Sequence, residues 1–407
     1  MSTTFWSIPT QSTRAWNRHA TVDLIRFTPE GISRVEIARQ LQLTRAAITE
    51  IINELVTLRL VREVESLQAG GRHPIALEIN PHLGKVIGID LGATHLTVLL
   101  SDFSAQVLGD IEIPININDG PEKILPRVQE TVQHLLRESG SSLSEICAAG
   151  IGVPGPIVIS AGAVGSPPIM RGWDQFPIVD YFLKFFGCPI SLNNDAELGA
   201  VGEWAYGAGR GVHNLAYVKV GTGIGSGLLL NGQFYRGTTG SAGEIGHITI
   251  EENGPQCSCG NRGCLEALAG GRAISQRATD AVLNGQRTLL SAITPPQMIT
   301  ARDVINAARS GDLLAQNILA DAGSHLGTAI ASLVNLFNPS MVIVGGNVSQ
   351  IGDLFLEPVR RTVQHRSLAA ASQAVRITTA LLGRRASGMG AVVQALTLAL
   401  HKIAERE

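Results

Sequence analysis

Apolar residues recur at helical spacing in three short segments near the start of the chain. The first, residues 20–27, stops before Pro29 and Gly31, where the chain must leave a helix. Ser33 is placed to cap a second helix that begins RVEIARQL and has a glutamate at its third position, and Thr44 is placed to cap a third. The pattern therefore predicts three short helices in succession.

The second and third helices are separated by QLQL, which is too short for anything but two packed helices that cross steeply. Their apolar positions predict a shared core of Ile37, Ala38, Leu41, Leu43, Ile48, Ile51, Ile52 and Leu55. This is a helix-turn-helix pattern, and it leaves the polar start of the third helix outside, where it can enter a DNA major groove. A helical bundle used for protein contacts is the alternative. The predicted DNA-contacting residues are Ser33, Arg34, Thr44, Arg45, Ala46, Thr49 and Arg72.

The residues after the third helix alternate between apolar and polar positions on both sides of a glycine pair. LVREVESLQAGGRHPIALEIN predicts a β-hairpin that would form a wing beside the helices, with Arg72 and His73 at its tip. Up to Ile48 the chain carries six arginines against three acidic residues, and this local excess suits a nucleic-acid contact. Glu50 opposes it, because a carboxylate repels phosphate and can only accept from a base edge such as cytosine N4.

From Gly84 onward, β-branched runs end in glycine-rich turns, which indicates an α/β fold with strands on either side of a cleft. The strand-turn-strand segment around Asp90, Gly92 and Thr94 can wrap a phosphate. The segment 221–227 has glycine at every second position, so its backbone N–H groups can approach a phosphate closely. Each signal is weak alone, because hairpin turns and sheet corners use the same residues.

Asn193, Asn194 and Asp195 lie at a strand-to-helix junction in the segment PISLNNDAEL. A carboxylate there can act as a general base on a hydroxyl, and the helix N-terminus beyond it offers free N–H donors. For Asn193, a plain helix cap is an equally good interpretation.

A metal-ligand pattern stands out between residues 240 and 266. His247, Cys257, Cys259 and Cys264 have the spacing H-x9-C-x-C-x4-C and offer one imidazole and three thiolates, a donor set typical of structural zinc. Three of the five cysteines fall in this stretch, which is a poor match to scattered core residues. Such a metal would also hold Glu244 and Glu266 on a polar surface that can grip a hydroxyl-rich ligand.

Composition limits the remaining possibilities. The chain has 407 residues, 44% of them hydrophobic and 16% charged, which predicts a folded protein of two or three domains. Its polar, tryptophan-bearing start and the lack of a long apolar run predict a cytoplasmic protein without membrane insertion. The net charge of −2 means that any nucleic-acid contact must be local.

The chain resembles the ROK family (repressors, open reading frames and kinases), in its longer helix-turn-helix form. The resemblance rests on five motifs taken together, which are DLGAT, NNDAELGA, GTGIGSGL, GEIGH and CSCGNRGCLE. The resemblance implies a winged helix-turn-helix followed by a two-lobed actin/hexokinase-like (ribonuclease H-like) α/β domain with a sugar in the cleft. We expect a DNA-binding domain at 1–82, a small lobe at 83–201 plus about 388–407, and a large lobe at 202–387 that carries the zinc.

By the same resemblance, Asn194, Asp195, Glu244, His247 and Glu266 would contact the sugar, and Asp195 would be the base if the protein were a kinase. The nucleotide-contacting positions would be Asp90, Gly92, Thr94, Gly221, Thr222, Gly223, Gly225, Gly345 and Gly346. Two positions depart from the kinase pattern D-x-G-G-T-K, because this chain has Ala93 in place of a glycine and His95 in place of the lysine.

The resulting expectation is a sugar-responsive transcriptional regulator, a repressor of carbohydrate uptake or catabolism genes. It would bind operator DNA as a homodimer or homotetramer, because a palindromic site needs two heads. Zinc would be structural. The alternative is an ATP-dependent sugar kinase carrying a DNA-binding head, which would also need Mg-ATP.

Overall fold

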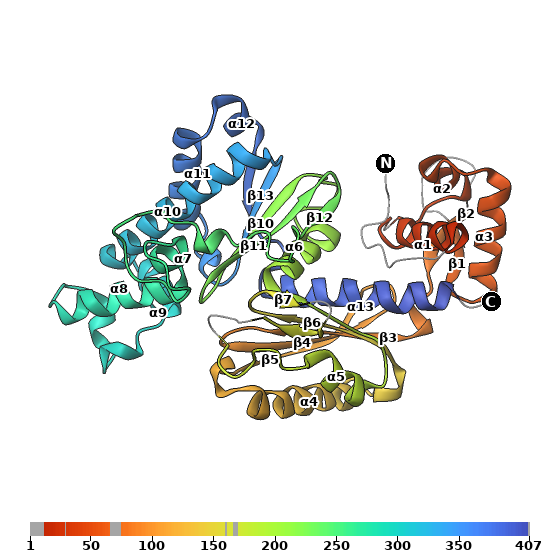
Figure 1. The fold of residues 1–407 in the computed structure, drawn as a ribbon, viewed down its shortest axis with the longest axis horizontal. Coiled ribbons are helices and arrows are strands. Elements are labelled where there is room, and N and C mark those ends of the chain that lie inside the picture. Colours follow the sequence, from red (N-terminus) through yellow and green to blue (C-terminus); the bar gives the residue numbers. More distant parts are fainter. Residues whose placement is uncertain (1–11, 29, 66–74, 159–160, 166–169, 406–407) are drawn as a thin grey trace.

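The computed structural model describes residues 12–28, 30–65, 75–158, 161–165 and 170–405. Residues 12–79, here called the head, lie at one side of a larger body built on two five-stranded sheets (Figure 1). The helices of the head are α1 (Thr13–Arg26), α2 (Arg34–Leu41) and α3 (Arg45–Thr57), and its antiparallel hairpin is β1 (Val61–Glu65) with β2 (Ile75–Ile79).

The helix caps of the head confirm most of the sequence pattern. The Ser33 side chain accepts a hydrogen bond from the Glu36 N–H at 3.2 Å, and the Thr44 side chain accepts one from the Ala47 N–H at 3.2 Å. The predicted start of the first helix is wrong, since α1 begins at Thr13. Its first two turns are largely polar in sequence, so they have no apolar stripe to detect. The predicted wing-tip residues Arg72 and His73 lie outside the described residues.

One continuous hydrophobic core joins the head to the body. Ile37, Ile48 and Leu55 of the head belong to the same buried cluster as Leu396 and Leu400 of the body. The two body residues come from the C-terminal helix α13 (Ala386–Ala404), which runs over the first sheet and reaches the head (Figure 1). The head is therefore packed onto the body by apolar burial and is not merely tethered to it.

The first sheet has the strand order β5-β4-β3-β6-β9. Its first three strands are antiparallel and the last two pairs are parallel. Helices α4 (Pro121–Glu138) and α5 (Ile178–Phe186) cover one face, and α13 covers the other. The strands are β3 (Lys85–Leu91), β4 (His95–Asp102), β5 (Val107–Pro114), β6 (Ile146–Val153) and β9 (Ile190–Asn194), with a small hairpin of β7 (Ile157–Val158) and β8 (Ala163–Val164) beside them.

The second sheet repeats this plan with the order β12-β11-β10-β13-β14, again antiparallel in its first three strands and parallel afterwards. Its strands are β10 (Leu215–Val220), β11 (Ile224–Leu230), β12 (Gln233–Tyr235), β13 (Met341–Gly345) and β14 (Arg376–Thr379). Strand β14 was not predicted from the sequence. RITT is too short to show an alternating pattern.

Two helices lie between the sheets, α6 (Asp195–Tyr206) and α13, and they pack against each other. Their backbones come so close that a Cβ on Gly390 would lie 1.9 Å from the Leu198 carbonyl oxygen. Residue 201, expected as a domain boundary, lies inside α6, so the expected division of the body stays a prediction. The other helices are α7 (Leu265–Ala269), α8 (Gly271–Leu283), α9 (Ala301–Arg309), α10 (Leu313–Phe337), α11 (Asp353–Arg366) and α12 (Ala369–Ala374). Within the described residues, none of the helices has both the length and the apolar character needed to cross a bilayer.

Candidate functional site

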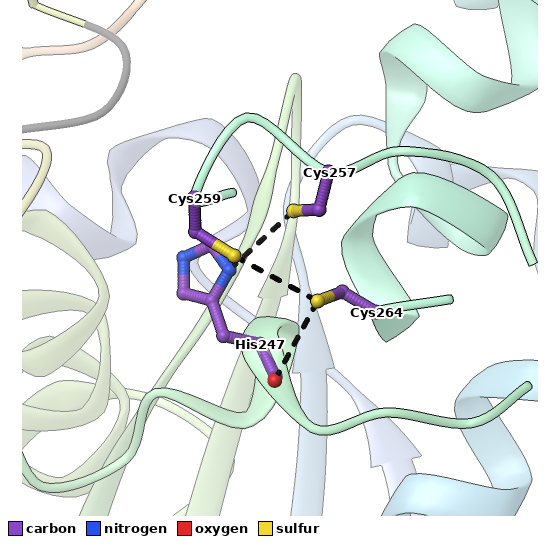
Figure 2. Close-up of side chains that lie close together, drawn as sticks. All are labelled: His247, Cys257, Cys259 and Cys264. Atoms are coloured by element: carbon purple, nitrogen blue, oxygen red, sulfur yellow. Dashed lines mark hydrogen bonds between the residues drawn. The ribbon is translucent and has the colours of Figure 1, made fainter. Parts of the chain in front are cut away.

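The imidazole and the three thiols predicted as metal ligands converge on one point (Figure 2). One ligand atom from each of His247, Cys257, Cys259 and Cys264 lies within 4.8 Å of the others. The Cys257 Sγ is 3.7 Å from the His247 Nδ1, and the Cys259 and Cys264 Sγ atoms are 3.8 Å apart. These residues could therefore hold a metal ion in a four-ligand arrangement.

Tight backbone turns bring the thiols together. The Cys257 N–H donates to the Asn261 carbonyl at 2.8 Å, which closes the turn between the first and third cysteine. Gly263 has a positive φ of 64°, and a Cβ there would lie 1.5 Å from the Glu251 carbonyl oxygen. Only glycine fits this position, so the glycine beside the last cysteine is part of the site's construction.

The same loop carries one candidate sugar ligand into the body. Cys264 precedes α7, and Glu266 lies in its first turn. The Glu266 Oε2 accepts a hydrogen bond from the Ile224 N–H at 2.9 Å, next to the glycine turn between β10 and β11. One oxygen of Glu266 thus fixes that turn, and the other makes no hydrogen bond within the described part of the chain.

Glu244 directly precedes the short 3-10 helix Ile245–His247 and is partly buried. Burial raises the pKa of Glu244 above its ordinary value, His247 opposes this, and the negative charges of Asp195 and Glu266 add to it. The predicted sugar residues Glu244, Asp195, Glu266 and His247 therefore act on one another electrostatically. Converging carboxylates are suited to accept hydrogen bonds from several sugar hydroxyls.

Asn194 is the N-cap of α6, with its Oδ1 accepting from the Ala196 and Glu197 N–H groups at 2.9 and 3.1 Å. Its Nδ2 donates to the Gly155 carbonyl at 3.1 Å. The helix-cap interpretation for Asn193 is wrong, because Asn193 is the strand residue before the cap and instead donates to Glu197 at 3.2 Å. Asn194 and Glu244 both line a pocket that also touches Gly225 and Gly243.

Asp90, near the end of β3, belongs to an ion cluster whose central residue was not predicted from the sequence. The Lys219 Nζ lies 2.8 Å from the Asp195 Oδ2 and 3.6 Å from the Asp90 Oδ2. The His95 Nε2 lies 3.3 Å from the same Asp90 oxygen. The signal in the sequence was a single lysine in the otherwise apolar strand LAYVKV.

The charges of this cluster follow from its geometry. Burial alone would raise the pKa of Asp90, but the Lys219 ammonium and the His95 side chain hold it below its ordinary value. Burial alone would lower the pKa of Lys219, but Asp195 and Asp90 raise it. Both groups are therefore ionised at neutral pH.

Only part of the predicted glycine loop is a loop. The turn between β10 and β11 covers residues 221–223, whereas Gly225 and Gly227 lie within β11 and pair with Lys219 and Tyr217 of β10. The expectation that Gly225 belongs to an open loop is wrong. A Cβ on Gly227 would lie 2.6 Å from the Ala200 Cβ, so close packing of α6 requires this glycine.

The remaining predicted phosphate positions lie at strand ends. Gly92 and Thr94 lie in the turn between β3 and β4, and the His95 ring packs against Gly92, where a Cβ would lie 2.3 Å from it. Gly345 ends β13, and Gly346 follows with a φ of 86°. Gly221 and Thr222 accept backbone hydrogen bonds from Gly271 and Arg272 at the start of α8.

Four of the predicted DNA-contacting side chains form an exposed edge of the head, whereas Ser33 and Arg34 are partly buried and Arg72 lies outside the described residues. Thr44, Arg45, Ala46 and Thr49 are exposed at the start of α3. Arg34 is less available, because its guanidinium lies 2.8 Å from a Glu63 oxygen and donates to Asn53 at 3.0 Å. The opposing charge of Glu50 is met by Arg14, whose Nη2 lies 3.6 Å away.

Two sheets of equal strand order, enclosing two helices and a cleft lined by carboxylates, define the actin/hexokinase-like sugar kinase fold. The sequence profile of the ROK family matches residues 86–397, and the chain belongs to this family. A xylose repressor from Caldicellulosiruptor bescii is 32% identical over 367 residues, covering 90% of this chain and 92% of the repressor.

Two solved structures of ROK family proteins are similar to this chain. A ROK family transcriptional regulator, homologous to the Escherichia coli Mlc protein, has a TM-score of 0.81 at 27% identity and covers 97% of this chain and 99% of its own. A ROK family glucokinase from Streptomyces griseus, in complex with glucose and AMPPNP, has a TM-score of 0.69 at 30% identity and covers 77% of this chain and 99% of its own. The similarity to the regulator thus extends over a larger share of this chain than the similarity to the kinase.

Proposed function

We propose that this protein is a sugar-responsive transcriptional repressor whose head binds operator DNA and whose cleft binds a sugar effector. The observation that carries the proposal is the joint presence of an exposed α3 edge and a carboxylate-lined cleft in one packed structure. The similarity to a repressor over 90% of the chain supports the same function.

The head is proposed to be a winged helix-turn-helix. Helices α2 and α3 meet at a short turn in which Gln42 has a left-handed φ of 56°, and Ile32 bridges to Leu77 beside the β1-β2 hairpin. The exposed side chains of Thr44, Arg45 and Thr49 would face the major groove, while the hairpin would lie along the backbone.

Helix α13 supports a coupling between sugar and DNA, because it contacts both regions. Ser387, in its first turn, donates to the Asp195 carbonyl at 2.8 Å. At its other end, the Ala404 carbonyl accepts from Arg18 of α1 at 3.1 Å, and Arg18 Nε also donates to Glu54 of α3 at 2.7 Å. A sugar that shifts Asp195 would therefore act on a helix whose far end is linked to the proposed recognition helix.

The proposed sugar ligands are Asn194, Asp195, Glu244, His247 and Glu266. The spare oxygen of Glu266 and the carboxylate of Glu244 would accept from hydroxyls, and the His247 Nε2 would reach the sugar while Nδ1 faces the metal site. The effector class is a neutral sugar, since these groups match hydroxyls and not a second negative charge.

The four-residue cluster is proposed to hold a structural zinc through His247, Cys257, Cys259 and Cys264. One imidazole and three thiolates are the donor types that zinc favours, and their ligand atoms already lie within 4.8 Å of each other. Zinc would supply rigidity to the loop that carries Glu244 and Glu266, and no catalytic step is assigned to it.

A homodimer or homotetramer is proposed as the DNA-binding form, because two heads are needed to read a palindromic operator. The proposed division of the chain remains a head at 1–82, a small lobe at 83–201 plus about 388–407, and a large lobe at 202–387. Operator DNA and a sugar would be the partners of this assembly.

An ATP-dependent sugar kinase is the second candidate. It is favoured by the Asp195 carboxylate at the cleft and by the similarity to a glucokinase that was crystallised with glucose and AMPPNP. In that reaction Asp195 would take the proton of a sugar hydroxyl while the hydroxyl oxygen bonds the γ-phosphorus of Mg-ATP and ADP leaves.

Gel retardation of DNA from upstream of its own gene tests the repressor. We expect the protein to retard this DNA at low salt, and the retardation to decrease as the salt concentration rises. One sugar of a panel containing xylose, glucose and N-acetylglucosamine should change the retardation. Arg45→Ala should weaken DNA binding about 10- to 100-fold. Arg39→Ala is the matched control, because Arg39 is exposed on α2 and pairs with Glu36. Lack of retardation under every condition would reject the repressor.

A further inference from the structure

The ammonium of Lys219 lies between the two carboxylates on which a kinase reaction would depend. Its Nζ is 2.8 Å from the Asp195 Oδ2 and 3.6 Å from the Asp90 Oδ2. The side chains of Lys219, Asp195 and Asp90 are only 14%, 15% and 1% exposed, so water screens these charges weakly. Lys219 comes from β10 of the second sheet and Asp90 from β3 of the first, so the cluster ties the two sheets together.

This placement works against phosphoryl transfer. A general base must take up a proton and become neutral, but a neutral Asp195 would lose its ion pair with Lys219. The ion pair leaves the other lone pairs of Asp195 able to accept a hydrogen bond from a sugar hydroxyl.

We propose that Lys219 is a positioning residue that makes this cleft bind a sugar without phosphorylating it. The inference rests on the proposed sugar-binding function and specifies how that site works. Lys219 keeps Asp195 as a hydrogen-bond acceptor and prevents it from acting as a base.

Lys219 also connects the sugar site to helix α13. Its Nζ donates to the Ser387 Oγ at 3.1 Å, and the same Oγ donates to the Asp195 carbonyl at 2.8 Å. A sugar hydroxyl that binds Asp195 therefore meets a network that includes the first turn of α13. In this proposal one side chain has both roles, because Lys219 pairs with Asp195 and also links the sugar site to α13.

The rival role for Lys219 is to replace the cation that is lost at His95 and to bind a phosphate. The charges disfavour it, because one ammonium between two ionised carboxylates leaves an excess of negative charge in the cluster. Such a cluster repels phosphate. The two roles predict opposite effects when the lysine charge is removed.

The experiment compares the wild-type chain with Lys219→Met and with Lys85→Met, a control lysine that pairs with Glu145 at the start of β3. A coupled ADP-release assay uses Mg-ATP with xylose, glucose or N-acetylglucosamine, and calorimetry measures binding of each sugar. We expect ADP release from the wild type and from Lys85→Met to stay at the background rate measured without sugar. For Lys219→Met we expect a rate at least about tenfold above that background, within the range that a freed general base supplies. Lys219→Arg, which keeps the charge, should stay inactive.

Three results would overturn the proposal. The first is sugar-dependent ADP release by the wild type that Lys219→Met removes. The second is ADP release by Lys219→Met that stays at background although this variant still binds sugar. The third is sugar-dependent binding of Mg-AMPPNP by the wild type. If Lys219→Met fails to fold, Lys219→Thr and the wild-type AMPPNP titration decide the matter. DNA retardation by the wild type is scored separately, so loss of the repressor function and loss of this inference are distinguishable.

Discussion

The imidazole Nε2 of His401 lies 3.2 Å from the Oδ1 of Asp23, and both side chains are only 1% exposed. Asp23 belongs to α1 of the head and His401 to α13 of the body, so this contact lies inside the junction between them. Arg26, from the same face of α1, lies 3.6 Å from the same carboxylate and donates to Thr397 at 3.0 Å. The junction thus combines apolar burial with buried charge, which makes it sensitive to single substitutions.

Asp23→Ala should therefore damage the junction. Removing one partner of a buried charge group leaves Arg26 without its counter-charge, and we expect the free energy of unfolding to fall by about 3–5 kcal/mol. Chemical denaturation measures this loss. Asp280→Ala, an exposed acidic residue on α8, is the control and should stay within about 0.5 kcal/mol of wild type. If the variant retained full stability, the contact would not hold the head in place.

The junction should also weaken in acid. Burial, and then electrostatic repulsion from the neighbouring His401 ring, lower the pKa of His19 from 6.5 to about 4, with Asp23 opposing. The Glu405 carboxylate lies 3.2 Å from the His19 Nε2 and also faces it. Because the folded-state pKa is the lower one, the stability from neutral His19 is present above pH 6.5 and is lost as the pH falls toward 4, by on the order of 3 kcal/mol.

Thermal unfolding between pH 7.5 and 4.5 tests this, with His19→Gln as the comparison. The variant should show a flatter dependence of melting temperature on pH over that window than the wild type. Equal slopes for the two proteins would mean that His19 does not contribute to acid sensitivity.

Removing the metal should affect sugar binding before it affects the head. Chelation should loosen the loop between Glu244 and Glu266, so sugar-induced changes in DNA binding should weaken while the melting of the head is unchanged. Cys259→Ser should behave like chelation, and Cys147→Ser, a cysteine outside the cluster, should behave like wild type. Elemental analysis that finds less than about half a zinc per chain, after purification without chelator, would count against a structural zinc.

Glu244→Gln should separate stability from sugar binding. Because the pKa of Glu244 is raised in the folded state, the protonated carboxyl stabilises the fold. This contribution to stability is fully present below the unfolded-state pKa near 4.5 and is lost as the pH rises through the folded-state pKa. At pH 7 the ionised carboxylate costs stability, so the glutamine variant should melt at a higher temperature. Its sugar affinity should fall about 10- to 100-fold, since hydrogen bonds to a charged group contribute about 1.5–3 kcal/mol.

Calorimetry and thermal unfolding on the same samples check both parts. Glu252→Gln is the matched control, because Glu252 is an exposed neighbour on the same loop. A variant that binds sugar as tightly as wild type would remove Glu244 from the proposed sugar site.

Local patterns determined the parts of this protein that depend on neighbours in the chain. The caps at Ser33 and Thr44 follow from short-range hydrogen bonds, and the structure has them as predicted. The metal cluster also follows from local spacing, because its four residues lie on one looped segment. Short elements without a clear period, such as β14 and the first turns of α1, were not predictable in this way.

Tertiary structure decided what depends on residues far apart in the sequence. Lys219 is an ordinary strand residue until folding places its ammonium between Asp90 and Asp195, and no spacing rule predicts that meeting. The packing of α1 against α13, at opposite ends of the chain, likewise exists only in the fold, where shared apolar burial and the contact of Asp23 with His401 join the head to the body. Sequence periodicity records which face of an element is buried, but the partner that buries it is chosen by the folded chain as a whole.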